Sequence, residues 1–150
     1  MAMAEHPFLV TTTFQGDGTT IKYDATKPNR SDAVGKAFKL NPTTGKGELV
    51  VDEDEIEGIV TEVDDDDKFT GAYMFGGLTV PIGHNATVAV NDKIVGALGP
   101  DSAKGYVKGA TEVVDTNDTV AKLRTAVQAA EKGRGRVMEK TTTEVLVAFP

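Results

Sequence analysis

The sequence of 150 residues contains no cysteine, no tryptophan, two histidines and two serines. Without cysteine there are no disulfide bonds, thiolate zinc sites or cysteine nucleophiles. No apolar run approaches the roughly 20 residues that a membrane-spanning helix needs. The first residues, Met-Ala-Met-Ala-Glu-His-Pro, lack the basic and long apolar regions of a secretory signal. We therefore expect no secretory signal and no membrane partner.

The few residues suited to catalysis are scattered along the chain. His6 is near the amino terminus, His84 is in a Gly-His-Asn turn, and Ser31 and Ser102 are in expected loops without a Gly-x-Ser-x-Gly elbow. No nucleophile has a base beside it, so we expect no catalytic residues, no cofactor and no enzyme activity. A hydrolase that uses carboxylates of the acidic stretch is an alternative, which would need two carboxylates about 5–10 Å apart in a cleft.

The net charge of −7 originates in one acidic stretch. Between Glu48 and Lys68 there are 11 acidic residues and one base, which leaves 12 acidic and 15 basic residues elsewhere. Such a stretch repels nucleic acid, whose binding depends on neutralising phosphates, so we expect no nucleic-acid partner. It either faces a basic partner or forms solvated loops. Its candidate contact residues are Asp52, Asp54, Asp64, Asp65, Asp66 and Asp67.

The alternating carboxylates of this stretch do not follow the calcium-loop pattern. That pattern requires glycine at the sixth position of the loop. Loops that start at Asp52 and Asp64 have Glu57 and Phe69 at that position. We therefore predict no metal site, and weak, non-specific cation binding is the alternative.

Most of the chain shows the pattern of short β-strands. Runs of apolar and β-branched residues are separated by turns rich in glycine, proline and asparagine, which predicts a small β-barrel or β-sandwich. Asp64–Lys68 is expected to be an exposed turn, because a sheet interior would desolvate four carboxylates. The same five residues spell the recognition sequence of a tag-removing protease. Strands are expected at 7–14, 20–23, 34–40, 48–51, 56–63, 71–75, 78–82, 86–90, 93–98, 105–108, 136–139 and 144–149.

One α-helix is predicted in the carboxy-terminal half, at about residues 117–132. Val120, Leu123 and Val127 recur at helical spacing, and Asp118 is among several candidate N-caps. Gly133 follows as a C-cap residue.

The amino-terminal residues 1–31 are predicted to form an extended arm, and residues 32–150 a β-rich body. Four apolar residues of the arm are candidate contacts with another molecule: Phe8, Leu9, Val10 and Phe14. They would expose apolar surface unless the arm docks on its own body, a sister subunit or a partner. The other interpretation is an ordinary first strand of the domain's own sheet.

In this order, the features resemble the short capsid decoration, or cement, proteins of tailed bacteriophages. The resemblance covers roughly residues 33–149 and rests on short apolar and glycine-containing segments. These segments are 33–38, 56–60, 80–83, 88–95, 133–139 and 145–147.

The resemblance implies a small β-fold that binds the outside of an assembled phage head and bridges major capsid subunits. It implies a homo-oligomer, with a trimer favoured over a dimer, made in the host cytoplasm and located on the virion exterior. The candidate contacts of the arm would then touch the capsid or a sister subunit. No catalytic or cofactor residues come with the family. The alternative function is a non-enzymatic carbohydrate-binding or adhesion module, for which a chain without tryptophan is poorly equipped.

Overall fold

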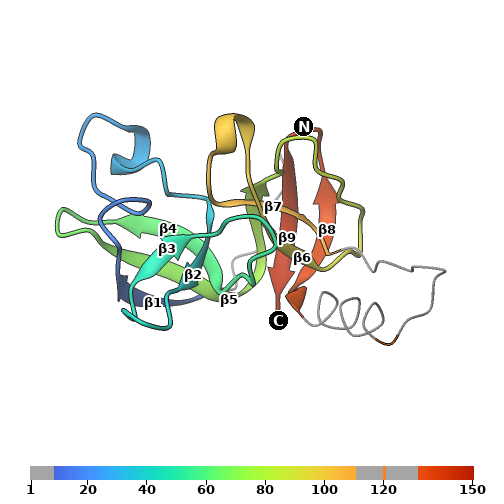
Figure 1. Cartoon of the computed structure of the whole chain (residues 1–150), viewed down its shortest axis with the longest axis horizontal. Helices are drawn as coiled ribbons and strands as arrows, with labels where there is room; N and C mark the ends of the chain where they lie inside the picture. The colour runs from blue at the N-terminus through green and yellow to red at the C-terminus, as the bar shows by residue number, and fades with distance from the viewer. Residues whose placement is uncertain (1–8, 111–119, 121–131) are drawn as a thin grey trace.

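The computed structural model describes residues 9–110, 120 and 132–150, and it shows a mainly β protein (Figure 1). This confirms the predicted fold class. The predicted helix at 117–132 lies almost entirely outside the described residues. In the described part of the chain, no helix is long and apolar enough to cross a bilayer. Two short 3-10 turns are η1 (Pro28–Arg30) and η2 (Pro100–Ser102).

Seven of the strands form one antiparallel sheet and two form a second sheet. The order in the larger sheet is β3-β2-β4-β5-β9-β8, and β1 pairs with β5 off this path. The smaller sheet consists of β6 and β7. The strands are β1 (Leu9–Gln15), β2 (Ala37–Leu40), β3 (Gly47–Leu49), β4 (Gly58–Val63), β5 (Lys68–Pro81), β6 (Ile94–Ala97), β7 (Tyr106–Gly109), β8 (Arg136–Lys140) and β9 (Glu144–Phe149).

Strand β5 is the longest strand and pairs with different neighbours along its two halves. Its first half pairs with β1 and β4, and its second half pairs with β9. The sequence predicts two strands separated by Gly76-Gly77, but the structure has one strand whose pairing with β9 is irregular between Phe75 and Leu78. The glycines therefore form a bulge within a continuous strand, because β9 supplies pairing partners on both sides of them.

The first half of β5 belongs to an aromatic core. Three rings meet there: Phe14 from β1, Phe38 from β2 and Phe69 from β5. Their centroids are 4.9–5.4 Å apart, and Phe38 and Phe69 are almost completely buried. Ring pairs at this separation add to the stabilisation from burial alone. Other buried members are Ile21, Ala33, Leu49, Val60 and Val63.

The second half of β5 belongs to a valine-rich core. Phe75 of β5 stacks on Phe149 of β9 with centroids 4.7 Å apart. The wall around this core is continued by bridges between Ile94 and Arg134 and between Ile82 and Val107. These bridges connect the small sheet to the segment just before β8 and to the residue just after β5, so the strands wrap around one interior. Its other buried members are Ala37, Val50, Ile56, Ile59, Ala72, Val80, Val88, Val137, Val145 and Val147.

The segment Leu9–Gln15, predicted as part of an arm, is a strand of the main sheet. Its residues pair with Phe75 through Lys68 of β5 in antiparallel register. Of the two interpretations that the sequence leaves open, the structure has the domain's own first strand at these positions. Phe14 shows the physical reason, because its ring is needed to complete the aromatic core.

Two predicted strands, Thr20–Tyr23 and Ala86–Val90, are irregular in the structure. For the first, the cause is Asp17. Its carboxylate accepts hydrogen bonds from the amides of Thr19, Thr20 and Ile21 and from the Thr20 hydroxyl. Aspartate side chains that bind nearby amides offer the backbone an alternative to sheet pairing.

We expect this Asp17 turn to make stability depend on pH in the acidic range. Partial burial raises the pKa of Asp17, but the hydrogen bonds from Ile21, Thr19 and Thr20 outweigh it and lower the pKa below its ordinary value. The contribution is therefore complete above the unfolded pKa and is lost as the pH falls through the folded pKa. Asp17→Ala should lower the free energy of unfolding by about 1–2 kcal/mol at pH 7.

Urea unfolding of both proteins between pH 7 and pH 2 checks this expectation. The difference between wild type and Asp17→Ala should shrink below about pH 4, where the unfolded carboxyl group begins to protonate. A difference that stays constant down to pH 2 would show that the carboxylate charge contributes nothing to the turn.

Candidate interaction surfaces

The structure divides the predicted acidic patch into two groups with different surroundings. The first group follows β3 and is paired with lysines. Asp54 lies 2.6 Å from the Lys39 ammonium, and Asp52 lies 2.8 Å from that of Lys108, which also contacts Glu53. Burial lowers the pKa of each lysine, but the adjacent carboxylates outweigh it and raise the pKa. These acids connect the β3–β4 loop to β2 and β7, and most of their charge is balanced locally.

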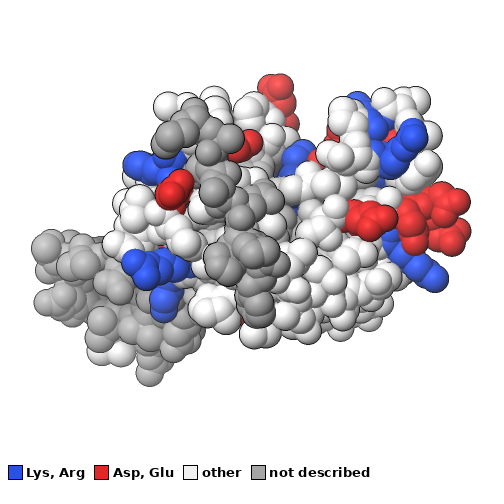
Figure 2. All heavy atoms as spheres, turned by 180° about the vertical axis from the view of Figure 1, so that it is seen from behind, with Lys and Arg blue, Asp and Glu red and all other residues white. Residues whose placement is uncertain are grey.

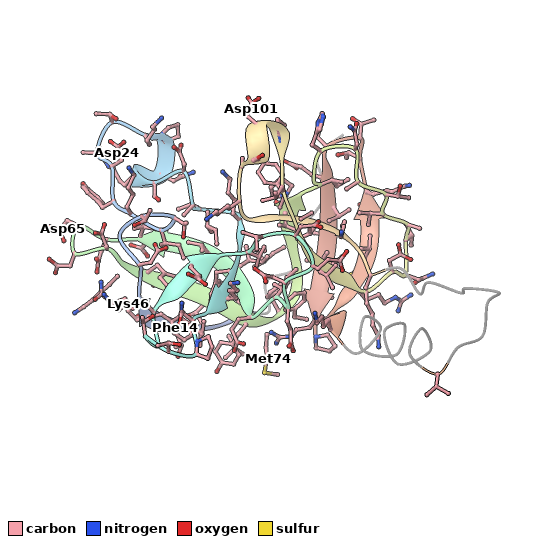
Figure 3. All side chains as sticks on the ribbon, in the orientation of Figure 1. Phe14, Asp24, Lys46, Asp65, Met74 and Asp101 are labelled. Carbon is pink, nitrogen blue, oxygen red and sulfur yellow. The ribbon has the colours of Figure 1, made fainter. Side chains whose placement is uncertain are left out.

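The second acidic group is the tip of the β4–β5 hairpin. Asp64, Asp65 and Asp66 are exposed, and their carboxylate oxygens lie within 4.8 Å of one another. Figure 3 places Asp65 at the extreme end of the molecule, and Figure 2 shows acidic side chains gathered at that end. We call residues Asp64–Asp67 the acidic tip. Exposed acidic groups of this kind are common without an ion.

Within the acidic tip, two carboxylates stabilise the turn itself. The Asp64 carboxylate accepts hydrogen bonds from the amides of Asp66 and Lys68. The Asp67 carboxylate accepts one from the amide of Tyr23, 2.7 Å away, and thereby ties the tip to the Asp17 turn. Asp65 remains fully directed to solvent. The predicted exposed turn is therefore confirmed, with structural as well as surface roles for its acids.

Because of this turn, we expect the native protein to resist cleavage after Lys68 by a protease of enteropeptidase specificity. The site must enter the protease as an extended chain, but Lys68 begins β5, and Asp67 has a φ of 59°. On the other side of the scissile bond, Phe69 is 1% exposed in the aromatic core. Cleavage thus requires opening of β5 from both of its neighbours.

Digestion followed by gel electrophoresis and mass spectrometry tests this expectation. The folded chain should remain intact under conditions that cut a peptide spanning residues 60–72 completely, and it should be cut once urea has unfolded it. Rapid cleavage of the folded chain after Lys68 would show that the hairpin opens locally at little cost in free energy.

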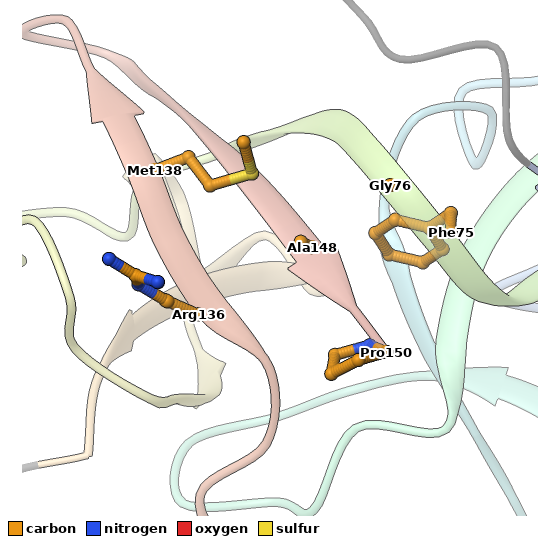
Figure 4. Close-up of a pocket in the computed structure, with 6 residues that line it drawn as sticks. All are labelled: Phe75, Gly76, Arg136, Met138, Ala148 and Pro150. Atoms are coloured by element: carbon orange, nitrogen blue, oxygen red, sulfur yellow. The ribbon is translucent and has the colours of Figure 1, made fainter.

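A shallow apolar groove lies on the outer side of β8 and β9 (Figure 4). Its volume is about 560 Å³. Met138, with 42% of its surface exposed, forms one wall. The guanidinium of Arg136, also on this wall, is bound to the Asn91 side-chain oxygen. The complete lining is Phe75, Gly76, Arg136, Met138, Ala148 and Pro150. An exposed apolar hollow of this kind is suited to contact with another protein surface.

The candidate contact residues of the arm differ in exposure. Leu9 is 44% exposed, whereas Val10 and Phe14 are half-buried, and Phe14 packs within the aromatic core. Phe8 lies outside the described residues. Leu9 is therefore available to a partner, and Phe14 is mainly a structural residue. Exposed Met74 of β5, which lies beside Val10 in the register, was not singled out from the sequence.

Of the residues considered for catalysis, His6 lies outside the described residues, and Ser102 ends the turn η2. His84 is exposed. Ser31 is buried, where its hydroxyl donates to the Lys22 carbonyl and accepts from the Ala33 amide. Its role in the loop is structural.

No protein-family model matches this chain. No curated protein matches it either.

Proposed function

We propose that this protein is a structural component of a phage virion that binds the outside of the head and bridges major capsid subunits. It acts there without cofactors, as a homo-oligomer, after synthesis in the host cytoplasm. The segments that resemble decoration proteins support the proposal, because many of their apolar residues belong to the valine-rich core or its wall. The resemblance thus concerns the residues that specify the β-fold.

The observation that carries the proposal is the apolar groove at Met138. A decoration protein needs an outward surface for protein contact, and it needs no convergent polar groups. The groove offers such a surface, with a flexible thioether on one wall. Many weak copies on a lattice bind firmly through multivalency, so one shallow contact for each copy is sufficient.

Co-sedimentation with undecorated heads of the phage that encodes the chain tests the proposal. The protein should saturate the heads, and Met138→Glu should weaken binding at least about tenfold, because it places a charge in an apolar contact. Val90→Glu is the matched control, since Val90 is similarly exposed, at 48%, and does not line the groove. Absence of wild-type binding would refute the proposed function.

A further inference from the structure

The apolar groove lies next to the point where the described chain begins. Leu9, the first described residue, is paired with Phe75 of β5, and both Phe75 and its neighbour Gly76 line the groove. Residues 1–8 precede Leu9 and lie outside the described residues. An extended chain spans about 3.3 Å for each residue, so a segment of this length is long enough to reach across the groove.

The outer face of β9 carries a buried leucine that neither core accounts for. Val145 and Val147 point into the valine-rich core, so Leu146 between them points to the opposite face of the sheet. Leu146 is nevertheless only 4% exposed, and in the described part of the chain it belongs to neither core. Its cross-strand neighbours are Thr79, which is small, and Glu139, which is charged and exposed. Burial of a leucine on this face therefore requires a further segment that covers it.

The groove belongs to the same face of the sheet. Ala148 is the next residue after Leu146 on this face, and it lines the groove together with Gly76 of β5 (Figure 4). Gly76 has no side chain, which leaves room above the sheet. One further step of the β1–β5 register would bring Phe8 opposite Gly76, and alternation would turn its ring to this face. A ring that covers a glycine of the neighbouring strand is a recurring device in β-sheets.

The composition of residues 1–8 suits an apolar groove. Six of these residues are methionine, alanine, proline or phenylalanine: Met1, Ala2, Met3, Ala4, Pro7 and Phe8. Glu5 is the acidic residue of the segment, and Arg136 is the charged side chain among the groove's described lining residues. The segment and the groove therefore match in both apolar character and sign of charge.

The other residues outside the description, 111–119 and 121–131, are less well placed to cover this face. The chain enters and leaves that region at the start of β6. The Ala110 amide donates to the Lys93 carbonyl, and Arg134 is held by two backbone hydrogen bonds with the first residue of β6. The amino-terminal segment, by contrast, adjoins the groove directly.

We propose that residues 1–8 of this chain bind the apolar groove and cover Leu146 in the free protein, with the Phe8 ring above Gly76. The groove thus holds a segment of its own chain as an internal ligand. Under the proposed function the same groove contacts the capsid, so the segment and the capsid compete for it. This competition rests on the proposed function, whereas the docking of the segment does not.

A single tryptophan tests the docking. The chain contains no tryptophan, so Phe8→Trp reports on this position alone. Its emission should be blue-shifted, and quenched less by iodide, relative to Val90→Trp, whose parent residue is 48% exposed. Both differences should disappear in urea. Because the segment binds within one chain, the emission should not change on dilution.

Met138→Glu shows whether the ring lies in the groove. Added to Phe8→Trp, it should move the emission toward that of the exposed control, because it places a charge in the apolar contact. Val90→Glu in the same background should leave the emission unchanged, and circular dichroism verifies that each variant is folded. An exposed Phe8→Trp, or a buried one that Met138→Glu does not affect, would overturn the inference. A red shift on dilution would also overturn it, because the segment would then bind a second copy.

Co-sedimentation with undecorated heads tests the competition. Phe8→Ala should bind the heads about tenfold more tightly than the wild type, because loss of a buried ring opens the groove in most molecules. Weaker binding of Phe8→Ala would show that the ring itself contacts the capsid, and it would refute the competition. If the heads bind neither protein, the proposed function fails, and the tryptophan result still decides the docking.

Discussion

Replacement of Arg134 by alanine should lower the free energy of unfolding by about 3 kcal/mol, although the residue is only half-buried and belongs to no strand. Its guanidinium donates to the carbonyls of Ile56, Glu57 and Tyr73. It also lies over the Phe149 ring, 4.5 Å from the centroid. Hydrogen bonds from a charged donor contribute about 1.5–3 kcal/mol each, less where solvent competes. Alanine removes all of these contacts together.

The geometry explains why one side chain has so large an expected effect. Ile56 and Glu57 precede β4, Tyr73 is in the middle of β5, and Phe149 ends β9. Arg134 itself is held by two backbone hydrogen bonds with Ile94 at the start of β6. The guanidinium therefore joins segments distant in sequence, beside Ile56 and Phe149 of the valine-rich core.

Arg134→Lys is the control for this prediction. Lysine keeps the charge and most of the stem, but a single ammonium cannot reproduce the planar fork that reaches several carbonyls at once. Chemical denaturation should therefore place Arg134→Lys between the wild type and Arg134→Ala. If lysine restored full stability, charge and stem packing would account for the effect, and the fork geometry would be irrelevant.

Replacement of Gly58 by alanine should lower the free energy of unfolding by about 3 kcal/mol for a steric reason. A Cβ at this position would lie 2.1 Å from the Ala72 carbonyl oxygen and 3.0 Å from the Phe38 ring. The first contact is with backbone of the paired strand, which cannot move without disturbing the β4–β5 register. Overpacking of this kind typically costs about 1–3 kcal/mol, and more where backbone must shift.

Gly45→Ala separates this steric effect from the general cost of losing a glycine. Gly45 has a φ of +71°, and nothing lies within 4 Å of a Cβ built there. Alanine at Gly45 should therefore cost only about 1 kcal/mol of backbone strain. Thermal unfolding monitored by circular dichroism compares both variants with the wild type. Equal losses would show that β4 shifts to accommodate the new methyl group.

Deletion of residues 1–14 has a different expected effect on stability for an arm than for a strand of the main sheet. If residues 1–14 were a separate arm, their deletion would leave the body folded. The structure instead pairs Leu9–Phe14 with β5 and packs Phe14 against Phe38 and Phe69. We therefore expect the deletion to destabilise the aromatic core.

The sequence by itself determined the fold class and the position of the exposed acidic turn. Alternation and turn residues are local properties, so β9 was predicted at its observed bounds, Glu144–Phe149. Asp64–Lys68 could only be a solvated turn, because four adjacent carboxylates cannot be buried. The candidate contacts were less well predicted, because exposure of Leu9 and burial of Phe14 depend on their neighbours in space.

Only the tertiary structure decided which segments meet. In the sequence, Gly76-Gly77 indicates a break between two strands, but in the structure β9 pairs with β5 on both sides of these glycines. Asp54 has no base next to it in the sequence, but in the structure it forms an ion pair with Lys39. Arg134 lies between the predicted helix and the predicted strand at 136–139, and its guanidinium joins three carbonyls. In each case the partner is distant along the chain. Local patterns do not encode such long-range contacts, which arise only when strand order and register are set.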